Sequence, residues 1–272
     1  MRKQAPMPVT VTESTRTSKL VGESKIFNVV ATTTQVGPTC PRECWFHPDS
    51  LFKAEAKALG LKPCYTLSGP MFFQVRASKF EGADFGSESL LPVRAKFDSI
   101  LQMHRFGRKV VDLIRWQTGG DILHPETGRP WVAFIDLIID VTSEATSMGI
   151  PVIGFTATWR EPESQRLRGL FHASVQTIED AALAISMGWT VAYAVLEKDV
   201  PAAVSALREL GVRAVYCPEQ ADKTDSCCNC GICASGDAML FHEVPFEIRY
   251  MMYRKKFLLP GIPMCIVLKM HK

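Results

Sequence analysis

A group of closely spaced cysteines toward the carboxyl end of the chain is the clearest sign of chemistry in this sequence. Cys227, Cys230 and Cys233 follow one another at a C-x2-C-x2-C spacing, and Cys217 precedes them. Four thiolates on a tight turn suit a tetrahedral zinc ion or an iron–sulfur cluster. Three close thiols with one distant thiol favour the cluster, since zinc sites more often use two separated pairs. A redox dithiol or a set of buried thiols is the alternative.

A second group of cysteines lies near the amino end, at Cys40, Cys44 and Cys64. We predict that these three residues ligate one metal centre. Three protein ligands leave a coordination position open, which distinguishes reactive metal sites from structural ones. His47 is a further candidate ligand. Two alternatives stay open: three partly buried thiols, because cysteine is often buried, or one centre that both groups of cysteines share.

Composition sets the class of protein. The chain has 272 residues, of which 47% are hydrophobic and 22% charged, so we expect a sizeable packed core. The nine cysteines are grouped and odd in number, which fits metal-bound thiolates in a reducing cytoplasm better than a disulfide framework. The first twenty residues lack an apolar stretch, and the uncharged run 181–196 reads as a helix, Gly188 and a strand. We therefore expect a cytoplasmic location and no membrane partner.

The strands and helices of the fold must position these cysteines. Strands are predicted from β-branched and apolar runs, and helices from apolar periodicity with Gly or Pro at the ends. Residues 177–180 resemble a capping box, which predicts a helix start there. The predicted strands are 26–33, 110–116, 151–156, 170–175, 189–196 and 212–216. The predicted helices are 51–59, 91–104, 131–148, 177–187 and 201–210.

Alternation of strands and helices predicts an α/β fold with parallel strands and right-handed crossovers. Six uniform strands without an early G-x-G-x-x-G favour a partial (β/α)6 barrel over a doubly wound sheet. We expect residues 26–240 to form this barrel. Residues 1–25 are expected to be a flexible arm, and residues 241–272 an extension packed on the barrel.

The candidate residues follow the predicted strands, where parallel α/β folds place their sites. Gly119-Gly120-Asp121 is predicted to be a ligand-binding turn, or else a tight turn in which Asp121 caps the next segment. Thr156 and the residues up to Arg160 are candidate site-lining residues, as is Ser174. Cys40 and Cys44 follow the first strand in the same way, and Cys217 follows the sixth.

A cysteine loop after the first strand and Gly-Gly-acid after the second resemble the radical S-adenosylmethionine superfamily. In that superfamily a C-x3-C-x2-C loop holds a 4Fe-4S cluster through three thiolates, and Gly-Gly-Glu binds the amino group of S-adenosylmethionine. Cys40-x3-Cys44 matches the first two cysteines. His47 stands at the third position, and the next cysteine is Cys64. Gly119-Gly120-Asp121 matches Gly-Gly-Glu with Asp for Glu.

The chain also resembles an uncharacterised family of cysteine-rich (β/α) proteins encoded by bacteriophages, over about residues 26 to 240. This resemblance implies a (β/α) fold and ligation of a cluster by the cysteines. It also implies a location in the cytoplasm of the host. The matching segments are Cys40-Pro41-Arg42-Glu43-Cys44, Cys64-Tyr65 with Gly69-Pro70, Arg115 with Gly120-Asp121-Ile122, and Cys217-Pro218-Glu219-Gln220 with the cysteines up to Cys233.

Together these patterns lead us to expect an iron–sulfur protein with one or two 4Fe-4S clusters. The resemblance implies a radical S-adenosylmethionine-like enzyme, with Gly119, Gly120, Asp121, Thr156 and Ser174 around the small-molecule cofactor and a nucleotide or nucleic acid as candidate substrate. The alternative is a non-catalytic zinc or iron–sulfur module for a nucleic-acid or protein partner. A basic stretch with aromatic residues is either a nucleic-acid contact or a solvated helix face. Its basic residues are Arg249, Arg254, Lys255 and Lys256.

Overall fold

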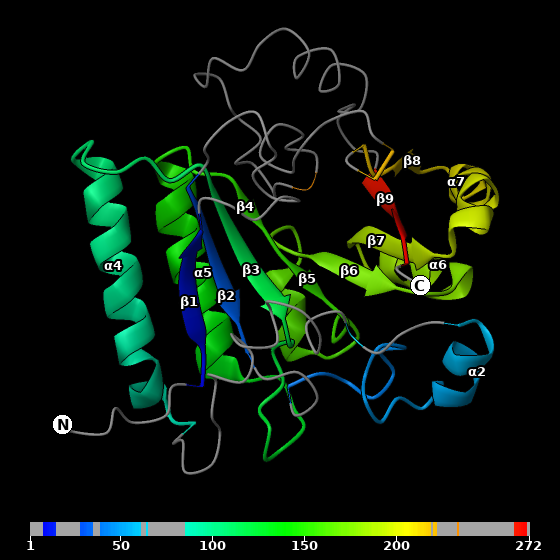
Figure 1. Cartoon of the computed structure of the whole chain (residues 1–272), viewed down its shortest axis with the longest axis horizontal. Helices are drawn as coiled ribbons and strands as arrows, with labels where there is room; N and C mark the ends of the chain where they lie inside the picture. The colour runs from blue at the N-terminus through cyan, green and yellow to red at the C-terminus, as the bar shows by residue number, and fades with distance from the viewer. Residues whose placement is uncertain are drawn as a thin grey trace, which may run out of the picture.

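The computed structural model describes residues 8–14, 28–34, 39–60, 64, 85–218, 220–221, 233 and 264–270. Within these ranges strands alternate with helices along most of the chain (Figure 1). The strands are β1 (Thr10–Ser14), β2 (Val29–Thr33), β3 (Leu113–Gly119), β4 (Val152–Ile153), β5 (Phe155–Thr156), β6 (His172–Val175), β7 (Thr190–Val195), β8 (Arg213–Tyr216) and β9 (Met264–Lys269). The α-helices are α2 (Lys53–Ala58), α4 (Leu91–Arg105), α5 (Val132–Ser147), α6 (Ile178–Ser186) and α7 (Val200–Glu209), with 3-10 turns at η2 (Ser87–Leu90), η3 (Glu163–Leu167) and η4 (Glu197–Asp199).

The strands form two sheets that a single glycine joins. One sheet has the order β1-β2-β3-β4 and the other has the order β5-β6-β7-β9-β8. β1 pairs antiparallel with β2, and the other strand pairings described are parallel. Gly154 lies between β4 and β5, and its carbonyl accepts a hydrogen bond from the His172 N–H at 2.9 Å. A Cβ at Gly154 would lie 2.3 Å from the Phe171 ring, so only glycine permits this approach.

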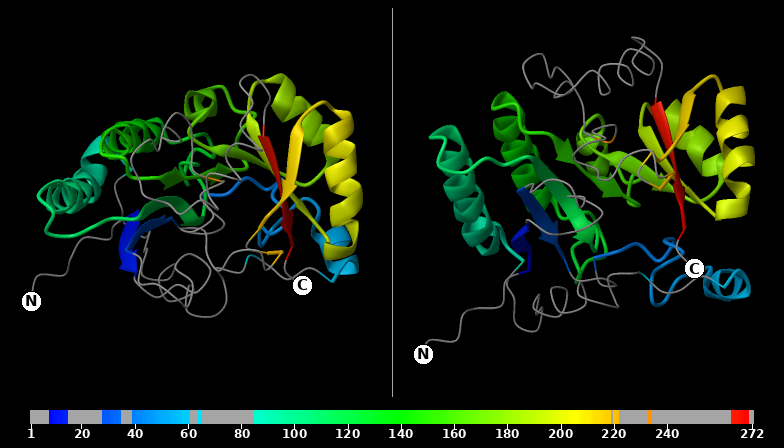
Figure 2. Two further views of the ribbon diagram at one scale, coloured as in Figure 1. Left: turned by 90° about the horizontal axis from the view of Figure 1, so that it is seen from above. Right: turned by 45° about the horizontal axis from the view of Figure 1, so that its top comes forward.

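The long helices α4, α5, α6 and α7 lie on the outer side of the curved sheets (Figure 2). A continuous core fills the space between helices and strands. Trp116 of β3 illustrates it: its ring lies 5.0 Å from that of Phe97 on α4, and its Nε1 donates to Thr142 Oγ1 on α5 at 2.9 Å. Helical crossovers placed this way are what parallel pairing requires.

Most predicted elements are confirmed, and the mixed α/β class with parallel sheets is confirmed with them. Each of the six predicted strands is present, although the predicted strand 151–156 is divided at Gly154. The predicted capping box is confirmed, since the Thr177 side chain accepts a hydrogen bond from the Asp180 N–H at 3.1 Å.

The two ends of the chain differ from our expectation. We predicted a flexible arm at residues 1–25, but Thr10–Ser14 pairs with β2 as an edge strand whose hydrogen bonds fix it. We predicted an extension packed on the barrel at residues 241–272, and within that range Met264–Lys269 is itself a strand of the second sheet, between β7 and β8. Among the residues described, no helix is long and apolar enough to cross a bilayer.

Candidate functional site

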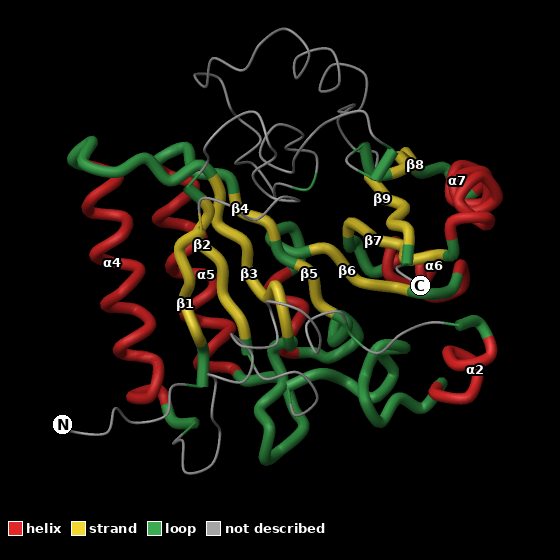
Figure 3. Tube along the Cα trace, in the orientation of Figure 1, coloured by secondary structure: helices red, strands yellow, loops and turns green. Residues whose placement is uncertain are grey.

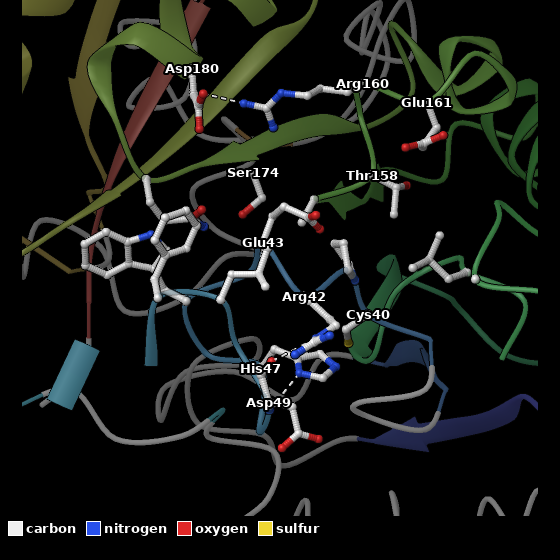
Figure 4. Close-up of a pocket in the computed structure, with 18 of the residues that line it drawn as sticks. Cys40, Arg42, Glu43, His47, Asp49, Thr158, Arg160, Glu161, Ser174 and Asp180 are labelled. Atoms are coloured by element: carbon white, nitrogen blue, oxygen red, sulfur yellow. Dashed lines mark hydrogen bonds and ion pairs between the residues drawn. The ribbon is translucent and has the colours of Figure 1, made fainter. Parts of the chain in front are cut away.

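An open cavity of about 1320 Å³ lies at the carboxyl ends of the strands. The loops that follow β3 and β5 gather at this end of the sheets together with α2 (Figure 3). One wall comes from the cysteine loop after β2, and the facing wall comes from the segments after β5 and β6 (Figure 4). The lining residues with polar or aromatic side chains include Cys40, Arg42, Glu43, Trp45, His47, Asp49, Phe52, Thr158, Arg160, Glu161, Ser174, Gln176, Thr177 and Asp180.

The cysteine loop brings Cys44 and Cys64 into electrostatic contact. The Cys64 N–H donates to the Phe46 carbonyl at 3.0 Å, which holds Cys64 against the loop. The pKa of the Cys44 thiol is raised to about 12, chiefly by burial and to a smaller extent by Cys64 and Asp121, whereas the backbone N–H groups of Phe46 and His47 oppose the rise. Cys44 is half-buried, and binding of a metal to its sulfur would release the thiol proton.

Cys40 lies on the cavity wall, on the same loop as Cys44. His47 also lines the cavity, and its Nδ1 accepts a hydrogen bond from the Asp49 N–H at 2.8 Å. Within the described ranges, no group of three or more His, Cys, Asp or Glu side chains is arranged to hold a metal ion. The loop therefore supplies donors of the right chemistry for a thiolate-bound metal, and binding requires their side chains to converge further.

The Gly-Gly-Asp turn after β3 lies beneath the cavity. Gly120 has a φ of 79°, and a Cβ there would lie 2.0 Å from Thr34 Oγ1, so only glycine lets the loops after β2 and β3 approach so closely. Asp121 is 5% exposed and does not line the cavity. Its Oδ1 accepts from the Ile122 N–H at 2.8 Å and from Thr156 Oγ1 at 2.7 Å, and its Oδ2 accepts from the Ala157 N–H at 2.7 Å.

Asp121 thus joins the ends of β3 and β5. Burial raises the pKa of its carboxyl group to about 6, and the hydrogen bonds from Ala157, Thr156 and Ile122 oppose that rise. Of the five residues predicted to surround a cofactor, Ser174 lines the cavity, whereas Gly119, Gly120, Asp121 and Thr156 are not among its lining residues. The structure therefore brings Asp121 and Thr156 together directly, with their polar atoms turned toward one another.

A bulge in β3 precedes this turn. Ala31 of β2 pairs with Arg115, but Thr33 pairs with Gly119, so β3 holds extra residues between the two pairs. Gln117 in this bulge has a φ of 53°, and its buried Nε2 has no hydrogen-bond partner among the described residues. A bulge at the end of a strand re-aims the chain that follows, and here that chain is the Gly-Gly-Asp turn.

Except for Arg160, the charged residues on the cavity wall were missed by the sequence interpretation. Arg160, a predicted candidate, pairs with Asp180, and its guanidinium lies 4.0 Å from the centre of the Trp159 ring. Glu43 and Glu161 face the cavity from opposite walls (Figure 4). Charges in loops have no periodicity, and the only signal that could have found them is their place directly after a strand or a cysteine.

Of the second cysteine group, Cys227 and Cys230 lie outside the described residues, and Cys217 and Cys233 lie within them. Cys217 is buried at the end of β8, and Cys233 packs against the same apolar cluster around Ile266. His172 Nε2 lies 3.0 Å from the Cys233 carbonyl oxygen. Because a carbonyl only accepts hydrogen bonds, Nε2 carries the proton in this contact. The basic stretch at 249–256 also lies outside the described residues.

Comparison of the chain with models of protein families, with curated proteins and with solved structures finds no match.

Proposed function

We propose that this chain is an iron–sulfur protein and a radical S-adenosylmethionine-like enzyme built on a partial (β/α) barrel. One observation carries the proposal: the loop after β2 carries Cys44, its Phe46 carbonyl holds the Cys64 N–H, and its Cys40 lines a large cavity at the carboxyl ends of parallel strands. Reactive sites of parallel α/β folds lie at this edge. The curved sheets with helices on the outer side support the barrel (Figure 2).

Cys40, Cys44 and Cys64 would hold a 4Fe-4S cluster with one coordination position open. When such a cluster is bound together with S-adenosylmethionine, it would supply the one-electron reduction that cleaves S-adenosylmethionine and yields a radical. The amides of Phe46 and His47 would stabilise the Cys44 thiolate. Asp121 and Thr156 fix the floor below the cavity, and the Ser174 hydroxyl is available to a ligand on the wall. Cys217, Cys227, Cys230 and Cys233 would hold a second, saturated centre.

The proposal is tested by the metal content of protein purified without oxygen. We expect about eight iron and eight sulfide per chain, the content of two 4Fe-4S clusters. Cys44→Ser and Cys64→Ser should each lose about half of the iron. Cys265→Ser is the matched control, because Cys265 is buried in β9 within the core and should keep the full content. Zinc without sulfide would overturn the iron–sulfur proposal.

A second candidate function is a non-catalytic zinc or iron–sulfur module. The observation that favours it is the carboxylate of Asp121, because both of its oxygens accept hydrogen bonds from inside the protein. The donors belong to Ile122, Thr156 and Ala157. A carboxylate engaged in this way stabilises loops. Binding of S-adenosylmethionine to the cluster-loaded protein separates the two functions: the enzyme requires it, and absence of binding with clusters intact would leave the module.

A further inference from the structure

The cavity wall is divided into an apolar and a polar half. Trp45, Leu51 and Phe52 come from the cysteine loop that leads into α2, whereas Thr158 follows β5, Ser174 lies near the end of β6 and Gln176 follows β6; all of them line the cavity. Ligand sites of this kind combine apolar and aromatic surface with a few polar groups that fix orientation. Sites for drug-sized ligands enclose roughly 300–1,000 Å³, so the cavity has room for a ligand beside a cofactor.

The aromatic half is a fixed platform. The rings of Trp45 and Phe52 are stacked with their centroids 5.7 Å apart and an angle of 29° between their planes. Trp45 packs against a buried cluster that contains Ala56 and Leu196, which anchors the pair on the fold. Phe52 remains 37% exposed. A rigid aromatic pair that remains accessible on a cavity wall suits stacking with a planar ring, because every nucleobase presents such a face.

The charges on the wall are mostly negative. Glu43, Asp49 and Glu161 make no ion pair among the described residues. Arg160, in contrast, is neutralised by Asp180. The Nε of Arg42, the other arginine on the wall, donates to the Asp49 carbonyl at 3.2 Å. The wall therefore repels phosphate groups, although the whole chain carries a net charge of +3.

We propose that the cavity binds an uncharged heteroaromatic ring that bears amino groups, a nucleobase presented by a nucleoside. The ring stacks on Phe52 and Trp45, and its amino groups donate to the carboxylates of Glu43 and Glu161, as cytosine N4 does to acidic side chains. The inference deepens the proposed function, because it names the substrate class of the same site, and it rests on that function only for the reaction. Phosphorylated forms are excluded by the acidic wall.

Calorimetric titration of the purified protein with cytidine, uridine and CTP tests the ligand class. Cytidine avoids the adenosine portion of S-adenosylmethionine, so its binding does not report on the cofactor. We expect cytidine to bind at least tenfold more tightly than CTP, because three added phosphates meet the acidic wall, and more tightly than uridine, which lacks the exocyclic amine. Tighter binding of CTP, or of a short oligodeoxycytidine, would overturn the inference in favour of a polyanion.

Variants assign the binding to the platform. Phe52→Leu keeps apolar volume but removes the stacking ring, and cytidine binding should weaken about tenfold. Phe106→Leu is the matched control: Phe106 is 70% exposed, lies outside the cavity wall and should leave binding unchanged. Glu161→Gln should weaken cytidine and strengthen CTP, whereas Glu209→Gln on α7 should change neither. Equal binding by Phe52→Leu and wild type would overturn the role of the platform.

The two proposals fail separately. Phe52→Leu should keep the iron and sulfide content of the wild type, because its side chain supplies no ligand. If the purified protein contains no iron and sulfide but still binds cytidine, the proposed function is overturned and the nucleoside site remains. A full complement of iron with no nucleoside bound would overturn the nucleoside site and leave the iron–sulfur proposal.

Discussion

Asp121 is the residue on which the floor of the site depends. Its carboxylate is buried and accepts hydrogen bonds from Ile122, Thr156 and Ala157, so it ties the turn after β3 to the end of β5. An unpaired buried carboxylate is costly, and one that meets several donors is tolerated. The raised pKa of this group, about 6, shows that burial outweighs the donors.

Replacement of this carboxyl group should change how stability depends on pH. Burial raises the pKa of Asp121 from its ordinary value of 3.8 to about 6 in the folded protein. The folded state therefore retains the proton more strongly, and the stabilisation present below pH 4 is lost as the pH rises through about 6. The loss is on the order of 1.4 kcal/mol per pH unit. In Asp121→Asn this loss should disappear, as measured by urea unfolding at pH 4 and pH 6.5.

The control for this experiment is Asp98→Asn on α4, where the carboxylate is 43% exposed and pairs with Arg94. That variant should keep the pH dependence of the wild type, because exposed ion pairs contribute little. An Asp121→Asn protein that loses stability between pH 4 and pH 6.5 as steeply as the wild type would contradict the assignment.

His172 is the second residue whose environment defines its state. It is 3% exposed and stacks with Phe155 at 5.4 Å, and burial lowers its pKa. The ring is therefore neutral, with its proton on Nε2 toward the Cys233 carbonyl. His172→Phe should keep the stack but lose this donor, at a cost of about 1 kcal/mol in guanidinium unfolding.

His104→Phe is the comparison for this variant, because the His104 ring also meets a backbone group, the Val111 N–H at 2.9 Å, but lies far along the chain from the cysteines. Only His172→Phe should make Cys233 more reactive toward iodoacetamide, because it removes the contact of the His172 ring with the Cys233 backbone. Equal reactivity of Cys233 in both variants would count against the contact.

At the scale of elements, most of the fold could be predicted because its signals are local. Runs of β-branched residues marked the six strands, and Thr177 with Asp180 marked the start of α6. β1 was missed because Thr10–Ser14 is short and mostly polar, and its strand form depends on pairing with β2 and on burial of Val11 in the core, neither of which is local in sequence. β9 was missed because its partners β7 and β8 are distant in sequence.

Gly154 limits what the junction between the sheets tolerates. Gly154→Ala should destabilise the protein by about 1–3 kcal/mol, because the added methyl group would lie 2.3 Å from the rigid Phe171 ring. Thermal unfolding would measure the loss. The double variant Gly154→Ala with Phe171→Leu should recover part of it relative to the sum of the two single variants. Purely additive effects would argue that the two side chains do not meet.

At the scale of the whole molecule, the site was only partly accessible to sequence reasoning. The rule that parallel folds place sites after strands located Cys40, Thr158, Arg160 and Ser174 on or near one cavity. It did not separate the cavity wall from the layer beneath it, where Asp121 lies. That separation depends on side-chain direction at a bulge, which no local pattern encodes.

Cooperative folding of the second sheet should depend on the buried side chain of Ile266 in β9. Ile266 is fully buried in β9, so Ile266→Asp places a carboxylate in the core and should abolish cooperative unfolding in circular dichroism. Ile266→Val should cost only about 0.5–1.5 kcal/mol. Leu183→Asp, at a position 47% exposed on α6, is the control and should unfold like the wild type. A cooperative Ile266→Asp protein would argue against β9 lying inside the sheet.

The position of β9 also determines when this protein can fold. Among the described strands, β8 pairs only with β9, and β9 follows β8 in the chain. At roughly 5–20 residues per second, the ribosome finishes β8 seconds before its neighbour emerges. During that interval β7 and β8 must stay apart, and the gap between them must remain open. The second sheet is therefore completed only after Met264–Lys269 has been synthesised, and until then the edges of β7 and β8 are open to pairing with other chains.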